Sequence, residues 1–215
     1  MSDIALRQDI EDELAFEPAL DSANIGVAVK NGVVTLTGHV PNFAQKHLAE
    51  TAVKRVKGVR GIAEELTVDL GASNPYADED IARRAVTALD LNVLVPVGEI
   101  QVKVERGWVT LAGEVDWDYQ RNVAASELRK LRGVVGLTNA VTLKPKVAPS
   151  DIENRIRDAL RRNADVESER VKVLVEGAKV KLEGRVNTWA DREAVERAAW
   201  SAPGVHVVED HVSVD

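Results

Sequence analysis

The hydrophobic and polar positions of this chain follow one pattern that occurs three times. Apolar and polar residues alternate along residues 27–40 (VAVKNGVVTLTGHV), with an Asn-Gly pair at the centre. The same arrangement returns at 102–115 (VKVERGWVTLAGEV) and at 173–186 (VLVEGAKVKLEGRV). Because the side chains of a strand point alternately to its two faces, each copy predicts a β-hairpin with one buried face.

A helix is predicted on each side of every hairpin. Before the hairpins, apolar residues recur at every fourth position, which places them on one helical face. They are Leu6, Ile10 and Leu14, then Ile81, Ala85 and Leu89, then Ile152, Ile156 and Leu160. The second helices are expected to begin near Asn42, Trp117 and Thr188 and to end at Gly58, Gly133 and Gly204.

Two details of the second helix can be predicted as well. Asn42 is a good N-cap residue, and Gln45, three positions later, is expected to complete that cap. Thr188 and Asp191 form the corresponding pair in the third copy. The apolar face of the first copy is expected to include Leu48. A last strand follows each second helix.

The repeated unit is therefore α-β-β-α-β, which predicts an α+β fold. A strand-helix-strand crossover makes the third strand parallel to the second, so each three-stranded sheet is mixed. The core positions fall on one side, and both helices are expected to pack on one face of that sheet. The predicted units cover residues 1–70, 76–144 and 149–215, with linkers rich in Pro, Gly and Ser at 71–79 and 144–150.

Composition and charge exclude several classes of function. The net charge is −7 and there is no cysteine. Binding to nucleic acid is not expected, because its affinity depends on cationic contacts to phosphates. The first twenty residues are acidic and lack the basic and apolar regions of a secretory signal. The sequence thus predicts a cytoplasmic protein, or a periplasmic one only if a leader has been removed.

Candidate catalytic or metal-binding chemistry is sparse. Neither a nucleophile elbow nor a phosphate-binding loop nor a dinucleotide fingerprint occurs. The four histidines, His39, His47, His206 and His211, do not show the spacing of a zinc site and are interpreted as solvated. We therefore expect no metal, no cofactor and no enzymatic activity.

The repeated unit resembles the BON domain. The resemblance rests on the hairpins NGVVTLTGHV and RGWVTLAGEV and on the segments VKGVRGI and LRGVVGL after the second helices. It covers nearly the whole chain and implies three tandem BON domains. It further implies a non-catalytic protein associated with osmotic and envelope stress, which binds phospholipid surfaces, other proteins or small ligands.

Residues that differ between the copies are the candidates for binding, because shared residues serve the fold. Trp108 replaces Val33 and Lys179 on the open sheet face, and Trp200 replaces Lys54 and Arg129. Aromatic residues beside cations are typical of contacts with anionic membranes or acidic proteins, although cations near a helix C-terminus also complement the helix dipole. The candidate binding surface comprises Trp108, Trp117, Tyr119, Arg121, Arg129 and Trp200.

The open sheet faces also differ in character. In the first two units the outward residues are small and mostly uncharged, whereas the third unit carries Lys172, Lys179, Lys181, Glu183 and Glu209. We expect the first two faces to be covered by each other, by a second protomer of a homo-oligomer or by a partner.

Two functions from different classes follow from the sequence. The first is a stress-associated binding protein whose middle unit contacts an anionic phospholipid surface or a protein partner. The alternative is a sensor that binds a small molecule or an ion between its units.

Overall fold

The computed structural model describes residues 2–71, 76–144, 151–162 and 170–214, which form three similar units. Each unit contains two helices and a three-stranded sheet, so the predicted fold class is confirmed. In unit 1 the elements are α1 (Asp3–Phe16), β1 (Ile25–Lys30), β2 (Val33–Val40), α2 (Phe43–Arg55) and β3 (Gly61–Val68), with a short 3-10 helix at Ser22–Asn24.

Units 2 and 3 repeat this order. Unit 2 contains α3 (Asp78–Leu91), β4 (Ile100–Glu105), β5 (Trp108–Val115), α4 (Asp118–Arg129) and β6 (Gly136–Leu143). Unit 3 contains α5 (Ile152–Arg162), β7 (Val171–Glu176), β8 (Lys179–Val186), α6 (Trp189–Trp200) and β9 (Val207–Val214). In every sheet the middle strand pairs antiparallel with the first strand and parallel with the third, as predicted.

The cores lie between the helices and one face of each sheet. The buried residues of α1, α3 and α5 are the nine that recur at every fourth position in the sequence. The prediction for α2 is wrong in one detail, because Leu48 is only half-buried. Ala49, Ala52 and Val53 are buried instead. Small residues on this face allow the helix to lie close to the sheet.

The helix ends follow the predictions only in part. The side chains of Asn42 and Thr188 cap α2 and α6 as expected, and Asp191 completes the second cap. Gln45 does not complete the first cap, because its side chain accepts a hydrogen bond from the Asp21 amide. The helices end three to four residues before the predicted glycines, which turn the chain toward the last strand with positive φ angles.

The hairpin turns explain why the copies tolerate different residues. Asn31 and Arg106 both adopt positive φ angles, 54° and 52°, in front of a glycine. A left-handed conformation is costly for arginine. Here the Asp78 carboxylate, from the start of α3, accepts hydrogen bonds from the amides of Arg106 and Gly107 at 2.7 and 2.8 Å. Asp3 holds the turn of unit 1 in the same way.

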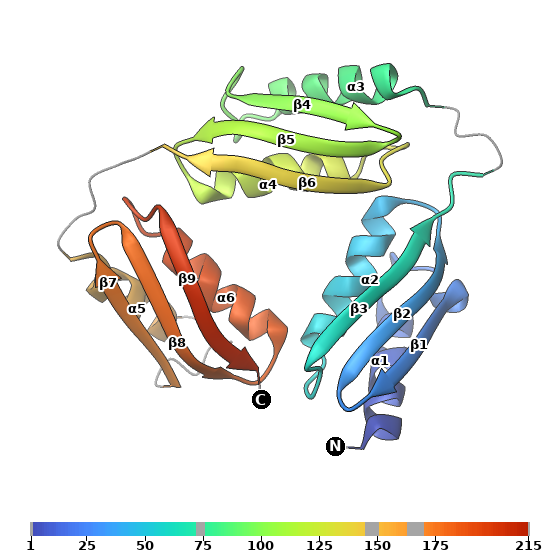
Figure 1. Ribbon diagram of the computed structural model, residues 1–215, viewed down its shortest axis with the longest axis horizontal. Coiled ribbons are helices and arrows are strands. Elements are labelled where there is room, and N and C mark those ends of the chain that lie inside the picture. Colours follow the sequence, from blue (N-terminus) through green and yellow to red (C-terminus); the bar gives the residue numbers. More distant parts are fainter. Residues whose placement is uncertain (1, 72–75, 145–150, 163–169, 215) are drawn as a thin grey trace.

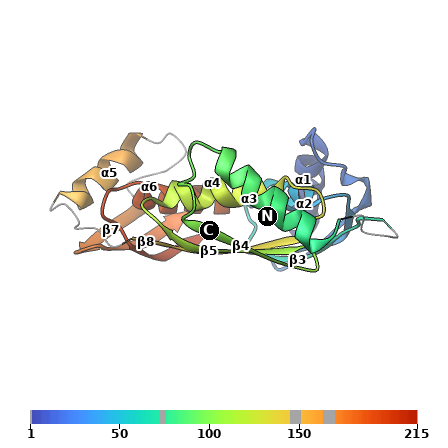
Figure 2. The same cartoon turned by 90° about the horizontal axis from the view of Figure 1, so that it is seen from above.

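The three units form a flat ring (Figure 1). The helices α2, α4 and α6 and the strands β3, β6 and β9 face its centre, and β1, β4 and β7 are the outer edges. The open sheet faces lie on one side of the ring and α1, α3 and α5 toward the other (Figure 2). The open faces of units 1 and 2 therefore do not cover each other, and Val33 and Trp108 are 45% and 49% exposed. Cover by a second protomer or a partner stays a prediction.

Candidate functional site

The second helices of the three units meet around a central cavity of about 600 Å³. Its walls come from all three units: Phe43, His47, Glu50 and Lys54 of α2; Asp118, Arg121, Asn122 and Arg129 of α4; Leu137 of β6; and Glu193, Glu196, Arg197 and Trp200 of α6. Lys54, Arg129 and Trp200 occupy the same position of the repeat. These three residues look like surface residues in the sequence, but all of them line the same cavity.

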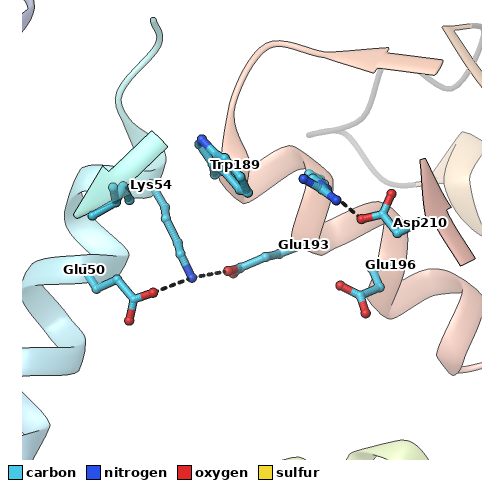
Figure 3. A pocket seen from close by; sticks show the side chains of 8 residues that line it. Glu50, Lys54, Trp189, Glu193, Glu196 and Asp210 are labelled. Carbon is cyan, nitrogen blue, oxygen red and sulfur yellow. Dashed lines mark hydrogen bonds and ion pairs between the residues drawn. The ribbon is translucent and has the colours of Figure 1, made fainter. Parts of the chain in front are cut away.

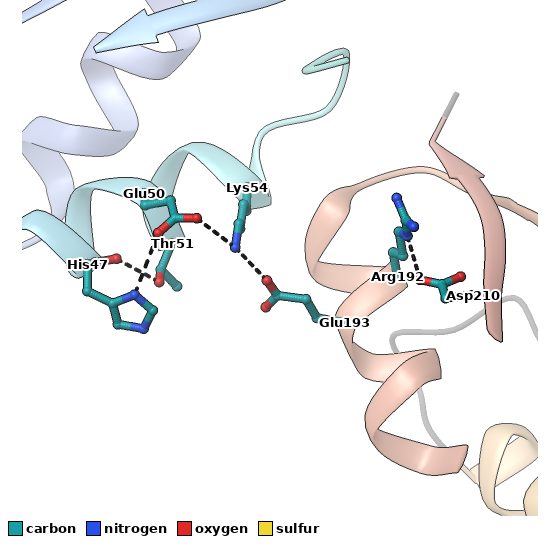
Figure 4. Close-up of polar contacts among 7 residues, drawn as sticks. All are labelled: His47, Glu50, Thr51, Lys54, Arg192, Glu193 and Asp210. Atoms are coloured by element: carbon teal, nitrogen blue, oxygen red, sulfur yellow. Dashed lines mark hydrogen bonds and ion pairs between the residues drawn. The ribbon is translucent and has the colours of Figure 1, made fainter. Parts of the chain in front are cut away.

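The junction between units 1 and 3 closes the ring. The Lys54 ammonium lies between the carboxylates of Glu50 at 3.0 Å and Glu193 at 2.8 Å, and so joins α2 to α6 (Figures 3 and 4). The Trp189 indole packs against the core of unit 1 and donates a hydrogen bond to the Val59 carbonyl at 3.0 Å. A pocket of about 370 Å³ lies beside these groups.

The charges at this junction stabilise one another. The His47 ring, 3.7 Å away, and the Lys54 ammonium lower the pKa of Glu50 to about 2, against the effect of its burial. Burial lowers the pKa of Lys54, but the hydrogen bonds to Glu193 and Glu50 outweigh it and the net pKa is raised. Burial lowers the pKa of Arg129, which faces the same carboxylates. The lowered pKa of Glu50 and the raised pKa of Lys54 keep this pair charged at neutral pH.

The junction between units 2 and 3 is built differently. In units 1 and 3 the cation of the second helix pairs with an acid on the last strand: Lys46 with Glu64 at 3.0 Å, and Arg192 with Asp210 at 2.6 Å. In unit 2 the corresponding residue is the neutral Asn139, whose side-chain amide donates to the Arg121 carbonyl at 2.9 Å.

Without that acid, Arg121 makes other contacts. Its guanidinium pairs with Asp118 at 2.5 Å and lies 4.7 Å above the Trp200 ring of unit 3. The contact with the Asp118 Oδ1 atom is an ion pair without regular hydrogen-bond geometry. Arg121 therefore links two units, and no pattern within one unit indicates that role.

A groove of about 650 Å³ lies beside this junction. Three aromatic side chains line it, Trp117 and Tyr119 from the start of α4 and Trp200 from the end of α6. The remaining wall residues are Asp118, Asn122, Val123, Ser126, Arg197 and Ser201. The groove brings together three of the six candidate binding residues.

The six candidate binding residues are thus divided among three places. Trp117, Tyr119 and Trp200 line the groove, while Arg121 and Arg129 line the central cavity, as does Trp200. Trp108 lies apart on the open face of β5, where its ring covers Gly136 and its Nε1 donates to Thr138 Oγ1 at 3.0 Å. A tryptophan that covers a glycine in the neighbouring strand also stabilises the sheet.

An exposed apolar segment that was not predicted from the sequence spans the end of α3 and the loop before β4. Leu91, Val93, Leu94 and Val97 are 78%, 96%, 50% and 74% exposed. Ile100, at the start of β4, pairs with Gly113 near the end of β5, so the segment lies at the end of unit 2 where α4 begins. Comparison of the copies could have found it, since LNVLVPV corresponds to FEPALDS at 16–22.

The described residues show no sign of a metal site or of a membrane-spanning helix. These residues contain no group of three or more His, Asp or Glu side chains arranged to hold a metal ion. None of the helices in that part of the chain combines the length and hydropathy needed to cross a bilayer.

Nearly the whole chain is similar to known proteins of one family. The model of the BON domain matches residues 2–69, 77–145 and 149–215. The osmotically-inducible protein Y of Escherichia coli (strain K12) is 29% identical over 148 residues, which are 67% of this chain and 74% of that protein. The outer membrane lipoprotein DolP of Haemophilus influenzae is 33% identical over 106 residues, about half of either chain (48% and 54%).

A solved structure of CdsD, a structural protein of the type III secretion system of Chlamydia trachomatis, aligns with 98% of this chain and 92% of its own. It has 19% identity and a TM-score of 0.27, values too low to support an argument about function.

Proposed function

Because the chain belongs to the BON domain family, we propose that it is a non-catalytic binding protein whose middle unit contacts a membrane phospholipid surface. The observation that carries this proposal is the exposed apolar segment of unit 2. Its four large side chains, Leu91, Val93, Leu94 and Val97, are clustered at one end of the unit. Exposed apolar patches of this kind mark sites of contact with membranes or proteins.

Aromatic residues at the same end favour a membrane. Trp117 and Tyr119 stand at the start of α4, beside the end of β5, and Tyr119 is half-exposed. Tryptophan and tyrosine prefer the boundary between lipid headgroups and acyl chains, while aliphatic side chains prefer the acyl region. The arrangement suits an end that dips into the outer part of a leaflet.

Charge contributes little to this contact. Lys144 lies at the same end, but Glu99 pairs with it at 3.0 Å, and Glu99, Asp116 and Glu114 together raise its pKa. The end is thus not basic, and burial of apolar side chains is the main expected driving force. Binding to neutral and anionic vesicles should therefore differ little and should depend weakly on salt.

The relatives support a role at a membrane under stress. One is named as osmotically inducible and the other as an outer membrane lipoprotein. The second name favours the cell envelope over the cytoplasm that the sequence led us to expect. Fractionation of cells that express the protein from its native locus distinguishes the two compartments.

Vesicle sedimentation tests the proposal. The double variant Leu91→Ser/Val93→Ser should bind vesicles of phosphatidylethanolamine and phosphatidylglycerol at least about tenfold more weakly, because two apolar anchors are lost. Phe16→Ser is the matched control, since Phe16 occupies the position of Leu91 in unit 1 and is 85% exposed. Equal binding of the double variant and the wild type would contradict the proposal and direct attention to a protein partner.

A further inference from the structure

We propose that the groove between units 2 and 3 is a binding site for a small anion with a flat aromatic body. The groove shares Trp117 and Tyr119 with the end of unit 2 that is proposed to contact a membrane, but Leu91, Val93, Leu94 and Val97 do not line it. Its volume of about 650 Å³ lies within the range of sites for small molecules.

The other two junctions indicate the shape of the ligand. Phe43, Asp118 and Trp189 occupy the same position at the start of the second helix. Phe43 packs against the core of unit 2, and Trp189 packs against the core of unit 1. At the junction between units 2 and 3 this position is an aspartate, and the groove lies beside it. At the two junctions where this position is aromatic, its flat ring lies between the units. A ligand with a flat ring is therefore expected to suit the third junction.

The walls of the groove favour an aromatic occupant. Trp117, Tyr119 and Trp200 supply three rings, and Val123 adds an aliphatic surface. Aromatic rings attract one another in offset-stacked and edge-to-face arrangements beyond the effect of apolar burial. Asn122, Ser126 and Ser201 add hydrogen-bonding groups to the lining.

The charges of the groove favour an anion. The Asp118 side chain is only 7% exposed and is neutralised by Arg121, and Asn122 donates to its second oxygen at 2.6 Å. Arg197 is exposed, and within the described residues its guanidinium forms no ion pair or hydrogen bond. The groove therefore presents one free cation, and guanidinium groups bind carboxylates and phosphates through paired hydrogen bonds.

Two ligands that differ only in charge test the proposal. N-acetyltryptophan carries a carboxylate, whereas N-acetyltryptophanamide is neutral. Each is titrated into the full-length ¹⁵N-labelled protein, and the four indole N–H signals are followed by NMR. The carboxylate should shift the signals of Trp117 and Trp200 but not those of Trp108 and Trp189, and the amide should bind at least about tenfold more weakly.

Two variants test which residues of the groove bind the carboxylate of the ligand and which bind its ring. Arg197→Gln should weaken binding of N-acetyltryptophan at least about tenfold but leave binding of the amide unchanged. Tyr119→Ala should weaken both ligands. Arg132→Gln, an exposed arginine outside the groove, is the matched control. Both Arg197 and Tyr119 are exposed, so these variants should fold.

Three results would overturn the proposal: equal affinity for the two ligands, shifts spread over all four indoles, or no shifts at millimolar ligand. The vesicle-binding variant Leu91→Ser/Val93→Ser should bind N-acetyltryptophan as the wild type does. Loss of membrane binding and loss of ligand binding can thus be observed separately.

Discussion

The junction between units 1 and 3 is closed by a packed ring and a bridging cation, with a pocket of about 370 Å³ beside them, whereas the junction between units 2 and 3 is open to a groove of about 650 Å³. At the first, the Trp189 ring packs against the neighbouring core and Lys54 bridges two carboxylates. At the second, Asp118 occupies the repeat position that Trp189 occupies at the first, and an aromatic-lined groove lies beside it. Units with the same backbone therefore make different junctions because of a few side chains on the second helix.

A second difference concerns the cation of the second helix. Lys46 and Arg192 pair with acids of their own unit, and this pairing ties the helix to the last strand. Asn139 cannot form an ion pair, and its amide donates to the Arg121 carbonyl instead, while the Arg121 guanidinium contacts Asp118 and Trp200. In unit 2, where this acid is replaced by a neutral residue on β6, the cation of the second helix thus contacts the neighbouring unit.

The largest effect is expected when the closed junction is opened. Trp189→Ala removes the ring that packs on unit 1 and the hydrogen bond to Val59, and should lower the free energy of unfolding by about 3 kcal/mol. The ring of units should also expand, which small-angle scattering detects as a larger radius of gyration. Trp108→Ala is the control, because the contacts of Trp108 with Gly136 and Thr138 lie within its own sheet. An unchanged radius of gyration in Trp189→Ala would show that this contact does not hold units 1 and 3 together.

A smaller effect is expected at the open junction. Arg121→Gln leaves the Asp118 carboxylate buried without its cation, and should cost about 2 kcal/mol. Lys46→Gln, the same change in unit 1, should cost about 1 kcal/mol, because the partly exposed Glu64 can be solvated. Urea denaturation of both variants gives the comparison. Equal losses would mean that Arg121 contributes no more than an ordinary partly exposed ion pair.

The sequence predicts features that depend on neighbouring residues better than it predicts contacts between units. The buried faces of α1, α3 and α5 follow directly from apolar residues at every fourth position, and three copies confirm one another. The junctions depend on pairs such as Lys54 and Glu193, which are 139 residues apart. No periodicity connects such pairs. Lys54, Arg129 and Trp200 therefore resemble surface residues in the sequence, although all three face the central cavity.

The candidate binding residues show the same limit. Comparison of the copies singles out Trp117, Tyr119 and Trp200, and the structure brings these three together in one groove. It also singles out Trp108, which lies elsewhere and covers Gly136. A position at which the three copies carry different residues is thus a position that the shared fold does not fix. Only the structure shows which of these residues are neighbours.

The smallest effect is expected from acid at the closed junction. The pKa of Glu50 is lowered from 4.5 to about 2 in the folded protein. Its contribution to stability is therefore fully present above pH 4.5 and is lost as the pH falls toward 2. Because the Glu50 side chain is 36% exposed, solvent screening limits this contribution to about 1 kcal/mol.

Glu50→Gln and Glu196→Gln separate this effect from general acid denaturation. Between pH 6 and pH 3, Glu50→Gln should lose less stability in urea denaturation than the wild type, because the amide does not titrate. Glu196 occupies the same position of α6 and, among the described residues, forms no ion pair, so Glu196→Gln should follow the wild type. If Glu50→Gln lost as much stability as the wild type, the charge of Glu50 would not support the closed junction. The ring would then depend on the Trp189 contact and on the pair of Lys54 with Glu193.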